Sequence, residues 1–287
     1  MSLKNAPFYE RDLSWLLFNY RVLQEAKDLN VPLFDRLKFM AIYSSNLEEF
    51  FKVRVAQIRR LVKSGKGTKK ALNFSPDVLL KAILKTVNNH QQELSTLFNK
   101  QFIPELKLNG ITIVSPEHLT LKQHEFVNNY FKEYLQAYIQ PILLINGKVR
   151  PFLNSGALYL FLHLTDKKAS RNKHQYAIVR LPSDQLPRFV ILPSSKKNEN
   201  QLMMLDDIVR LSVKYVFPGF HLKHAYSIKL TRDSELYIED EYEGDLVDKI
   251  KKSLVKRNVG SGSRLVYDRT MPANMLKLLQ KTFTIFP

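Results

Sequence analysis

The sequence predicts an α+β protein in which an N-terminal all-α helical bundle precedes a mixed α/β domain. In the first part, apolar residues recur at three- and four-residue steps, the spacing of one helix face. After Gly110, short apolar runs bounded by polar loops are typical of strands, with helical stretches between them. These strands and helices follow no strict βαβ order, which favours α+β. We expect domains at residues 1–108 and 109–287.

Helices are expected on both sides of Pro32, which breaks the chain. The first helix presents an apolar face formed by Leu13, Leu16, Tyr20 and Leu23. A second apolar stripe is formed by Leu33, Leu37, Met40 and Ala41. Both stripes predict amphipathic helices that pack into one bundle.

Asn46 is expected to begin a third helix. Asparagine is a good N-cap, and Glu49 follows three residues later, as in a capping box. One side of this helix is apolar, with Leu47, Phe51, Val55, Ile58 and Val62. A flexible basic loop at 65–70 is expected to follow it.

Ser75 and Pro76 open a long fourth helix. Its inward face is formed by Leu79, Ile83, Val87, Leu94 and Phe98. Pro104 and Gly110 are expected to end it.

The second domain is expected to mix short strands with helices. Strands are predicted at 111–114, 157–164, 176–181, 189–192 and 264–268, with a hairpin-like pair at 226–231 and 235–239 turned by 232–234. Helices are predicted at about 121–138, 205–216, 245–257 and 273–282.

Composition points to a soluble cytoplasmic protein with well-formed cores. Hydrophobic residues make up 45% of the 287 residues, which leaves little reason to expect disorder. The sequence has no cysteine, so a disulfide framework and a thiolate metal site are excluded. No apolar run reaches the ~20 residues that a transmembrane helix needs, and the N-terminus lacks the apolar core of a signal peptide.

The net charge of +17 favours an anionic partner such as a nucleotide, polyphosphate, nucleic acid or a membrane surface. A generally basic soluble protein is the plain alternative. The charge is unevenly distributed: residues 52–70 hold eight basic and no acidic residues, whereas 233–248 hold eight carboxylates. This pattern favours a groove for a polyanion on one face.

Five separated strings of the sequence resemble one known family. ERDLSWLLFNYRVLQEA at 10–26 and IYSSNLEEFFKVR at 42–54 resemble the N-terminal domain of the polyphosphate kinases, which build phosphate chains from ATP. LPSDQLPRFVILP at 181–193, YSIKLTRDSELYIEDE at 226–241 and RLVYDRTMP at 264–272 resemble the second, head domain of that family. The resemblance covers nearly the whole chain in colinear order.

This resemblance implies ATP/ADP and inorganic polyphosphate as substrates, with Mg²⁺. In the family, the γ-phosphate of ATP moves reversibly onto polyphosphate through a phosphohistidine on two phospholipase-D-like domains. Those domains lie downstream of the part that this sequence resembles, so we expect no catalytic residue and no metal ligand here, and no activity from this chain alone. The head domain serves in subunit contact, which implies a homodimer or higher homo-oligomer.

The resemblance gives Asn46 a second interpretation. In the family, the asparagine of the corresponding SNNLDEF-type string lies against the bound nucleotide, beside the adenine. Asn46 occupies that position, whereas the preceding asparagine of the family is Ser45 here. From the residues alone, Asn46 is either a plain cap or part of a helix start that holds an anion.

The charged residues that follow Asn46 have structural and functional interpretations. Glu48 and Glu49 are adjacent on a helix, so their carboxylates do not converge, and the helix dipole in a first turn accounts for them better than acid–base chemistry. Lys52, Arg54, Arg59 and Arg60 either bind phosphate or form a solvated face. Of these four, Arg54 is the candidate for contact with the nucleotide or polyphosphate.

Other motifs are incomplete or absent. His221 and Lys223 imitate the start of the phospholipase D motif HxKxxxxD, but its aspartate position is Ile228. Walker A, kinase Gly-rich loop and GxGxxG strings are absent, and no nucleic-acid-binding motif is found, so we expect no nucleic acid partner.

The arginines of PRFV (187–190) and TRD (231–233) could reach phosphate, although salt bridges with the acidic 239–248 segment are the expected role. The alternative function for the whole chain is a non-catalytic polyanion-binding or regulatory module.

Overall fold

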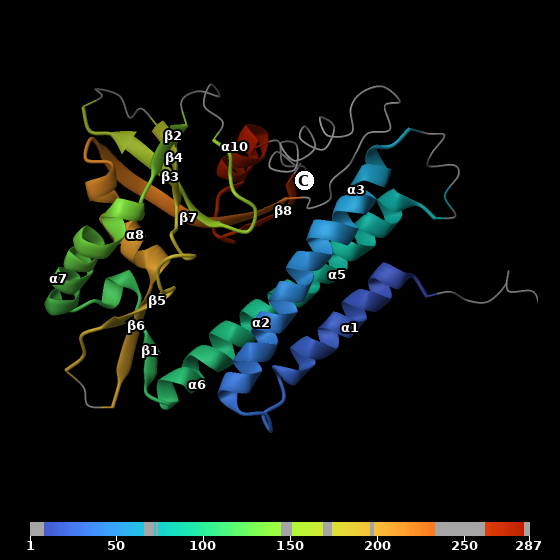
Figure 1. Ribbon diagram of the computed structural model, residues 1–287, viewed down its shortest axis with the longest axis horizontal. Coiled ribbons are helices and arrows are strands. Elements are labelled where there is room, and N and C mark those ends of the chain that lie inside the picture. Colours follow the sequence, from blue (N-terminus) through green and yellow to red (C-terminus); the bar gives the residue numbers. More distant parts are fainter. Residues whose placement is uncertain are drawn as a thin grey trace, which may run out of the picture. The chain divides into compact units, whose positions relative to one another are not determined.

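The computed structural model describes residues 9–65, 72, 74–144, 151–168, 174–195, 198–232 and 262–283 (Figure 1). The chain divides into two compact units, Met1–Leu106 and Lys107–Pro287. Each unit has its own core and is described by itself.

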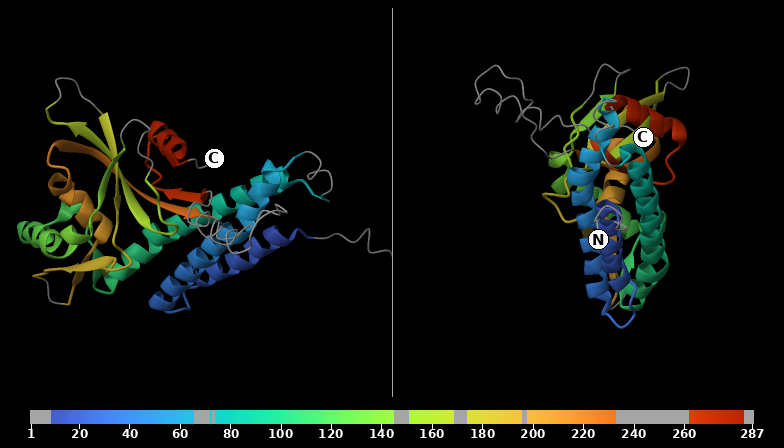
Figure 2. Two further views of the ribbon diagram at one scale, coloured as in Figure 1. Left: turned by 45° about the horizontal axis from the view of Figure 1, so that its top comes forward. Right: turned by 90° about the vertical axis from the view of Figure 1, so that its right-hand side faces the viewer.

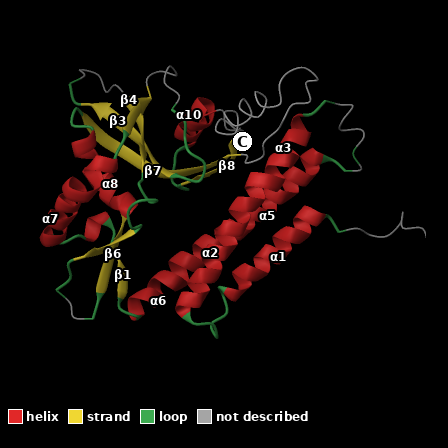
Figure 3. Ribbon diagram, viewed as in Figure 1, coloured by secondary structure: helices red, strands yellow, loops and turns green. Residues whose placement is uncertain are grey.

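Among its described residues, the first unit contains helices and connecting turns but no strand, as the sequence predicts (Figure 3). Its elements are α1 (Arg11–Glu25), α2 (Leu33–Phe50), a π-helical turn (Phe51–Val55), α3 (Ala56–Lys63), α5 (Pro76–Leu97), a second π-helical turn (Phe98–Phe102) and α6 (Ile103–Leu108). The core between α1, α2, α3 and α5 includes Leu16, Leu23, Leu47, Val55, Ile83 and Phe102. The predicted apolar stripes therefore face this core, except at Ala41, which is exposed.

Some helices begin where a nearby residue of the sequence favours a helix start. The Glu10 carboxylate accepts from the Leu13 backbone N–H at 2.8 Å and caps α1. Pro32 is the N-cap of α2, and Pro76 is in the first turn of α5. Pro104, however, does not end the helix, because helical structure continues to Leu108. The preceding π-helical turn explains this, since its wider ladder bonds the Ile103 N–H to the Phe98 carbonyl just before the proline.

The second unit contains two sheets. A three-stranded sheet has the order β1-β6-β5, and a five-stranded antiparallel sheet has the order β2-β4-β3-β7-β8. The strands are β1 (Ile111–Ile113), β2 (Pro141–Leu144), β3 (Leu158–Asp166), β4 (His174–Arg180), β5 (Phe189–Leu192), β6 (Asn200–Met204), β7 (Phe220–Arg232) and β8 (Gly262–Tyr267). The helical elements are 3₁₀ turns at Pro116–His118 and Gln136–Tyr138, α7 (Leu121–Tyr130), a π-helical turn (Phe131–Leu135), α8 (Leu205–Val216) and α10 (Ala273–Phe283).

Helices cover both faces of the five-stranded sheet (Figure 2). On one face, Leu160, Leu162 and Val179 pack with residues of α7 and α8. On the other face, Phe161 and Ile178 pack with α10 residues. Because side chains alternate along a strand, β3 and β4 supply both cores.

The helix at 205–216 and the strands at 111–114 and 189–192 were predicted closely. Strands β2 and β6 were not predicted. The predicted strand at 235–239 and helix at 245–257 lie outside the described residues, as does most of the basic loop at 65–70. In the described part of the chain, no helix is long and apolar enough to cross a membrane.

Candidate functional site

The interpretation of Asn46 as a helix start is wrong. Asn46 lies within α2, which continues through the π-helical turn into α3 without leaving helical backbone. The burial of Tyr43, Leu47 and Phe50 on one side of α2 explains why the helix runs through this point. Since the backbone N–H groups here bond within the helix, the proposed capping box and anion site at a helix start are both excluded.

Asn46 instead joins α2 to α1 through its side chain. The Asn46 Nδ2 donates to Asn19 Oδ1 at 3.1 Å, and Asn19 Nδ2 donates to the Tyr43 carbonyl at 3.2 Å. Asn19 is fully buried, whereas Asn46 is half-buried. The bond to Asn19 uses one hydrogen of the Asn46 amide, so a second N–H and the carbonyl oxygen remain outside it.

Arg54 is held by a buried carboxylate. Its Nε and Nη2 donate to the two Asp12 oxygens at 2.9 and 3.0 Å, and Nη1 donates to Gln57 Oε1 at 2.7 Å. The Asp12 side chain is 4% exposed and that of Arg54 is 34% exposed. The hydrogen bond with Asp12 raises the pKa of Arg54. This bidentate pair ties the start of α1 to the π-helical turn.

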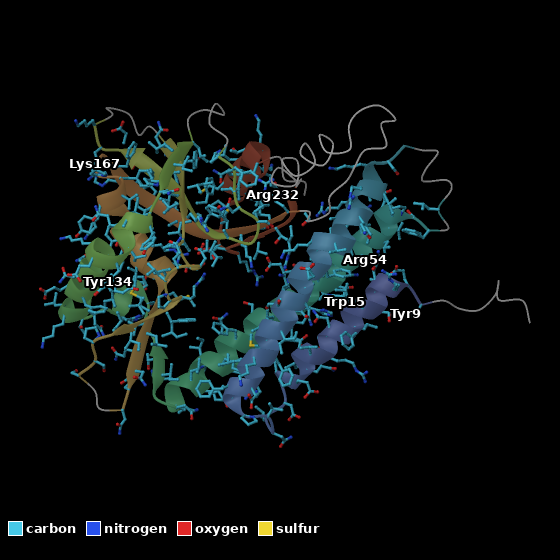
Figure 4. The ribbon with its side chains drawn as sticks, viewed as in Figure 1. Tyr9, Trp15, Arg54, Tyr134, Lys167 and Arg232 are labelled. Carbon is cyan, nitrogen blue, oxygen red and sulfur yellow. The ribbon has the colours of Figure 1, made fainter. Side chains whose placement is uncertain are left out.

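An aromatic pair lies on the same two helices. Trp15 of α1 stacks on Phe50 of α2 with ring centroids 4.4 Å apart and planes 3° from parallel. Figure 4 labels Trp15 and Arg54 among the side chains of the first unit. Asn46, Arg54 and the Trp15–Phe50 stack thus all lie where α1 meets α2 and the π-helical turn that follows it.

Asp12, Trp15 and Asn19 were not among the predicted site residues. A signal for two of them was present, because Asp12 and Asn19 share the helical stripe of Leu16 and Leu23. Polar residues at core-facing positions of a helix are buried only with partners. Here those partners are Arg54 and the Tyr43–Asn46 turn of α2.

The other basic residues of this segment are not a solvated face. Lys52, Arg59 and Arg60 are half-buried, and Lys52 lies 3.6 Å from Glu49 across one turn. Burial lowers the pKa of Arg59, and burial together with Arg59 lowers the pKa of Lys63. The ion pair with Lys52 gives Glu49 a structural role, as expected. However, Glu49 lies within a continuous helix and not in the first turn of one.

In the second unit, Arg188 of the PRFV string forms an ion pair with Asp206 at 3.0 Å. Asp206 is buried in the first turn of α8. The expected partner segment at 239–248 lies outside the described residues. Arg188 therefore has a structural partner, but a different one from the acidic segment named above.

Arg232 of the TRD string holds a neighbouring loop. Its Nε donates to the Leu153 carbonyl at 3.0 Å, and its guanidinium lies 4.6 Å from the Phe152 ring centroid. Burial lowers the pKa of Arg232. These contacts fix the loop before β3.

A shallow hollow lies along the surface of α1. Its volume is about 420 Å³, and its lining comes from α1 residues, among them Leu17, Phe18 and Arg21. Neither Asn46 nor Arg54 lines it. The amide of Asn46 and this hollow are therefore separate features of the bundle.

Comparison with known proteins decides the family. Residues 8–114 match the polyphosphate kinase N-terminal domain, and residues 122–287 match the polyphosphate kinase middle domain. The chain belongs to the polyphosphate kinase family. The resemblance of its five strings is thereby confirmed.

Relatives and a solved structure agree with this assignment. The chain is 35% identical to the polyphosphate kinase of Escherichia coli K12 and 36% identical to that of Halalkalibacterium halodurans, over 97% of this chain in each case. The crystal structure of the polyphosphate kinase from Porphyromonas gingivalis superposes with a TM-score of 0.81 at 32% identity over 99% of this chain. The chain spans 40% of each of those two relatives and 39% of the crystallised protein.

Proposed function

We propose that this chain forms part of the nucleotide pocket and the self-association surface of a polyphosphate kinase. In that reaction the γ-phosphate of ATP moves reversibly onto inorganic polyphosphate through a phosphohistidine. The observation that carries the proposal is the half-buried Asn46 amide, held by Asn19, within a chain that matches the family over residues 8–114 and 122–287.

The Asn46 side chain suits a purine edge better than a phosphate. A carboxamide offers an acceptor and a donor side by side, the pairing that recognises the N6 and N7 positions of adenine. The bond to Asn19 restricts rotation of the amide, which lowers the entropy cost of binding. Because α2 is continuous through Asn46, no helix N-terminus lies here to attract an anion, and recognition would depend on the side-chain amide alone.

Arg54 is a weaker candidate for nucleotide contact. The Asp12 carboxylate already compensates its charge, and three of its five N–H donors are used by Asp12 and Gln57. We propose that Arg54 mainly positions α1 beside Asn46.

Magnesium ligands are not evident among the residues that the structure describes. Among the described residues there is no group of three histidine, aspartate or glutamate side chains that could hold a metal ion, and both Asp12 oxygens are bound to Arg54. These residues do not fit a Mg²⁺ site, so no step is assigned to the metal here.

The experiment for this proposal measures binding of a non-hydrolysable ATP analogue to the natural gene product and to its Asn46→Ala variant. We expect the variant to bind the ATP analogue more weakly than the parent does. Its circular dichroism spectrum should be unchanged, which would show that the fold is intact. Equal affinity of the two proteins would refute the nucleotide role.

The phosphohistidine is expected outside this chain. All seven histidines lie in described positions. His90 is buried in the bundle, His118 is bonded to Ser115, and His163 is bonded to His174. With Mg²⁺ and ATP, residues 1–287 alone should form no acid-labile phosphoprotein, and labelling on any histidine would overturn this expectation.

The rival proposal is a polyanion-binding module without a nucleotide site. The basic segment 52–70, with eight basic and no acidic residues, supports it because such a segment attracts a polyanion. Polyphosphate binding that is unaffected by Asn46→Ala, together with no binding of the ATP analogue, would favour this rival.

Self-association is proposed for the second unit through β5. This strand is an edge of the three-stranded sheet, and Phe189 and Ile191 on one of its faces are 42% and 65% exposed. Apolar side chains on an open edge strand favour pairing with another chain.

A further inference from the structure

Three histidines meet on the five-stranded sheet beyond the part that α10 covers. His163 of β3, His174 of β4 and His224 of β7 project from the same face, because His163 pairs with His224 across one ladder and contacts His174 across the other. They come next after Phe161 and Tyr226 of the α10-facing core. His174 and His224 are exposed and His163 is half-buried, so the cluster is accessible.

Two of these rings are at a separation that suits a shared metal ion. His163 Nε2 and His174 Nδ1 lie 2.9 Å apart, with ring centroids 4.9 Å apart. Metal–nitrogen bonds of about 2.0–2.1 Å that subtend a right to tetrahedral angle place two ligand nitrogens about 2.9–3.4 Å apart. The two nitrogens are therefore already at the separation of a chelating pair. On binding, the donor ring carries its proton on its other nitrogen, and both rings turn so that their lone pairs meet at the metal ion.

The surroundings hold the His163 ring in place. It stacks on Tyr176 at 5.2 Å and on His224 at 5.8 Å. Rings locked by packing lose less entropy when they bind a ligand.

We propose that His163 and His174 form a two-imidazole chelate for a divalent transition-metal ion, with water completing the coordination. Imidazole nitrogen suits Cu²⁺, Ni²⁺ and Zn²⁺ and discriminates against Mg²⁺ and Ca²⁺. No described group of three side chains lies close enough to form a full protein-ligand set, so the site holds its metal by two bonds. The bound ion links β3 to β4, and the site is independent of the nucleotide role proposed for the first unit.

The test titrates residues 1–287 with Ni²⁺ by calorimetry and with Cu²⁺ by electron paramagnetic resonance. The parent should bind one equivalent, with hyperfine structure from two nitrogens. His174→Gln should weaken binding by about tenfold or more, since the second imidazole acts at high effective concentration. His163→Gln should do the same.

His124→Gln is the matched control, because His124 is exposed on α7 and lies outside the cluster. Its binding should equal that of the parent. Melting curves without metal check that each variant is folded. Parent-like binding by His174→Gln, or a one-nitrogen signal in the parent, would show adventitious binding to scattered histidines and overturn the proposal.

Discussion

Asn46 on α2 donates its side-chain N–H to the Oδ1 of Asn19 on α1 at 3.1 Å. Asn19 in turn donates to the Tyr43 carbonyl one turn earlier on α2. The fully buried Asn19 thus fixes how a half-buried amide is presented beside the α1–α2 contact.

Asn19→Ala should destabilise the chain. The substitution removes one buried and one partly buried hydrogen bond and leaves a small cavity, which together cost about 2–3 kcal/mol. Urea unfolding measures the change, with the exposed α1 substitution Ser14→Ala as control, expected to stay within about 0.5 kcal/mol of the parent. An unfolding free energy equal to that of the parent would show that the amide pair contributes nothing.

Arg54→Gln should destabilise because it leaves the Asp12 carboxylate buried without its cation. We expect a loss of about 1–3 kcal/mol, below the full value for a buried pair because Arg54 is partly solvent-exposed. The double variant Asp12→Asn/Arg54→Gln should recover part of it. If Arg54→Gln retains stability but loses affinity for the ATP analogue, Arg54 is a ligand contact.

Much of the fold could be predicted from local patterns. The helix at 205–216 was found because four apolar residues, Leu205, Ile208, Val209 and Val213, recur at helical spacing and all are buried. Strand β6 was missed because its sequence, NQLMM, lacks alternation. It forms through parallel pairing with β1 and antiparallel pairing with β5, which no local pattern reveals.

The candidate site shows where sequence reasoning ends. Residues 44–46, SSN, have the chemistry of a helix start, yet tertiary burial of Leu47 and Phe50 keeps α2 continuous. The partner of Asn46 is 27 positions away on α1. Such a pairing depends on how the helices pack, which no local pattern reveals. The family resemblance therefore pointed to Asn46, although the interpretation of this residue as a helix N-cap was wrong.

The stability of the first unit should fall in mild acid because of His90. This residue is buried against Tyr20, its Nδ1 has no hydrogen-bond partner among the described residues, and burial lowers its pKa against a smaller opposite effect of Glu93. Below the ordinary value of 6.5 the unfolded state binds a proton that the folded state does not. The contribution of neutral His90 to the free energy of unfolding is therefore fully present above that pH. It is lost as the pH falls towards the pKa that His90 has in the folded state.

The measurement is the unfolding free energy from pH 7.5 to 5, where one proton contributes at most about 1.4 kcal/mol per pH unit. His90→Gln should reduce this slope, and His124→Gln, on exposed α7, should not. The window stays above the titration of Glu93, whose pKa is lowered by Lys27 and Tyr20 against the effect of burial. Equal slopes for the parent and His90→Gln would exclude His90 as the cause.

Ile191→Lys should weaken self-association if β5 is the contact surface. A charge in place of a 65% exposed apolar side chain on an edge strand opposes pairing with a second chain. Sedimentation should show more monomer than for the parent. Val266→Lys, at a 37% exposed position on β8, is the control, and an unchanged dimer fraction in Ile191→Lys would assign the contact elsewhere.

The most direct test of the central claim is the affinity of the natural gene product for a non-hydrolysable ATP analogue after Asn46→Asp. The carboxylate cannot donate to Asn19 and offers no donor to a purine edge, and it adds a negative charge. Ser44→Asp is the matched control, since this exposed residue lies nearly opposite Asn46 around α2. We predict that Asn46→Asp weakens binding by about tenfold, or about 1.4 kcal/mol, while Ser44→Asp binds as the parent does. Parent-like affinity in Asn46→Asp would contradict the account and leave Asn46 as a helix–helix contact alone.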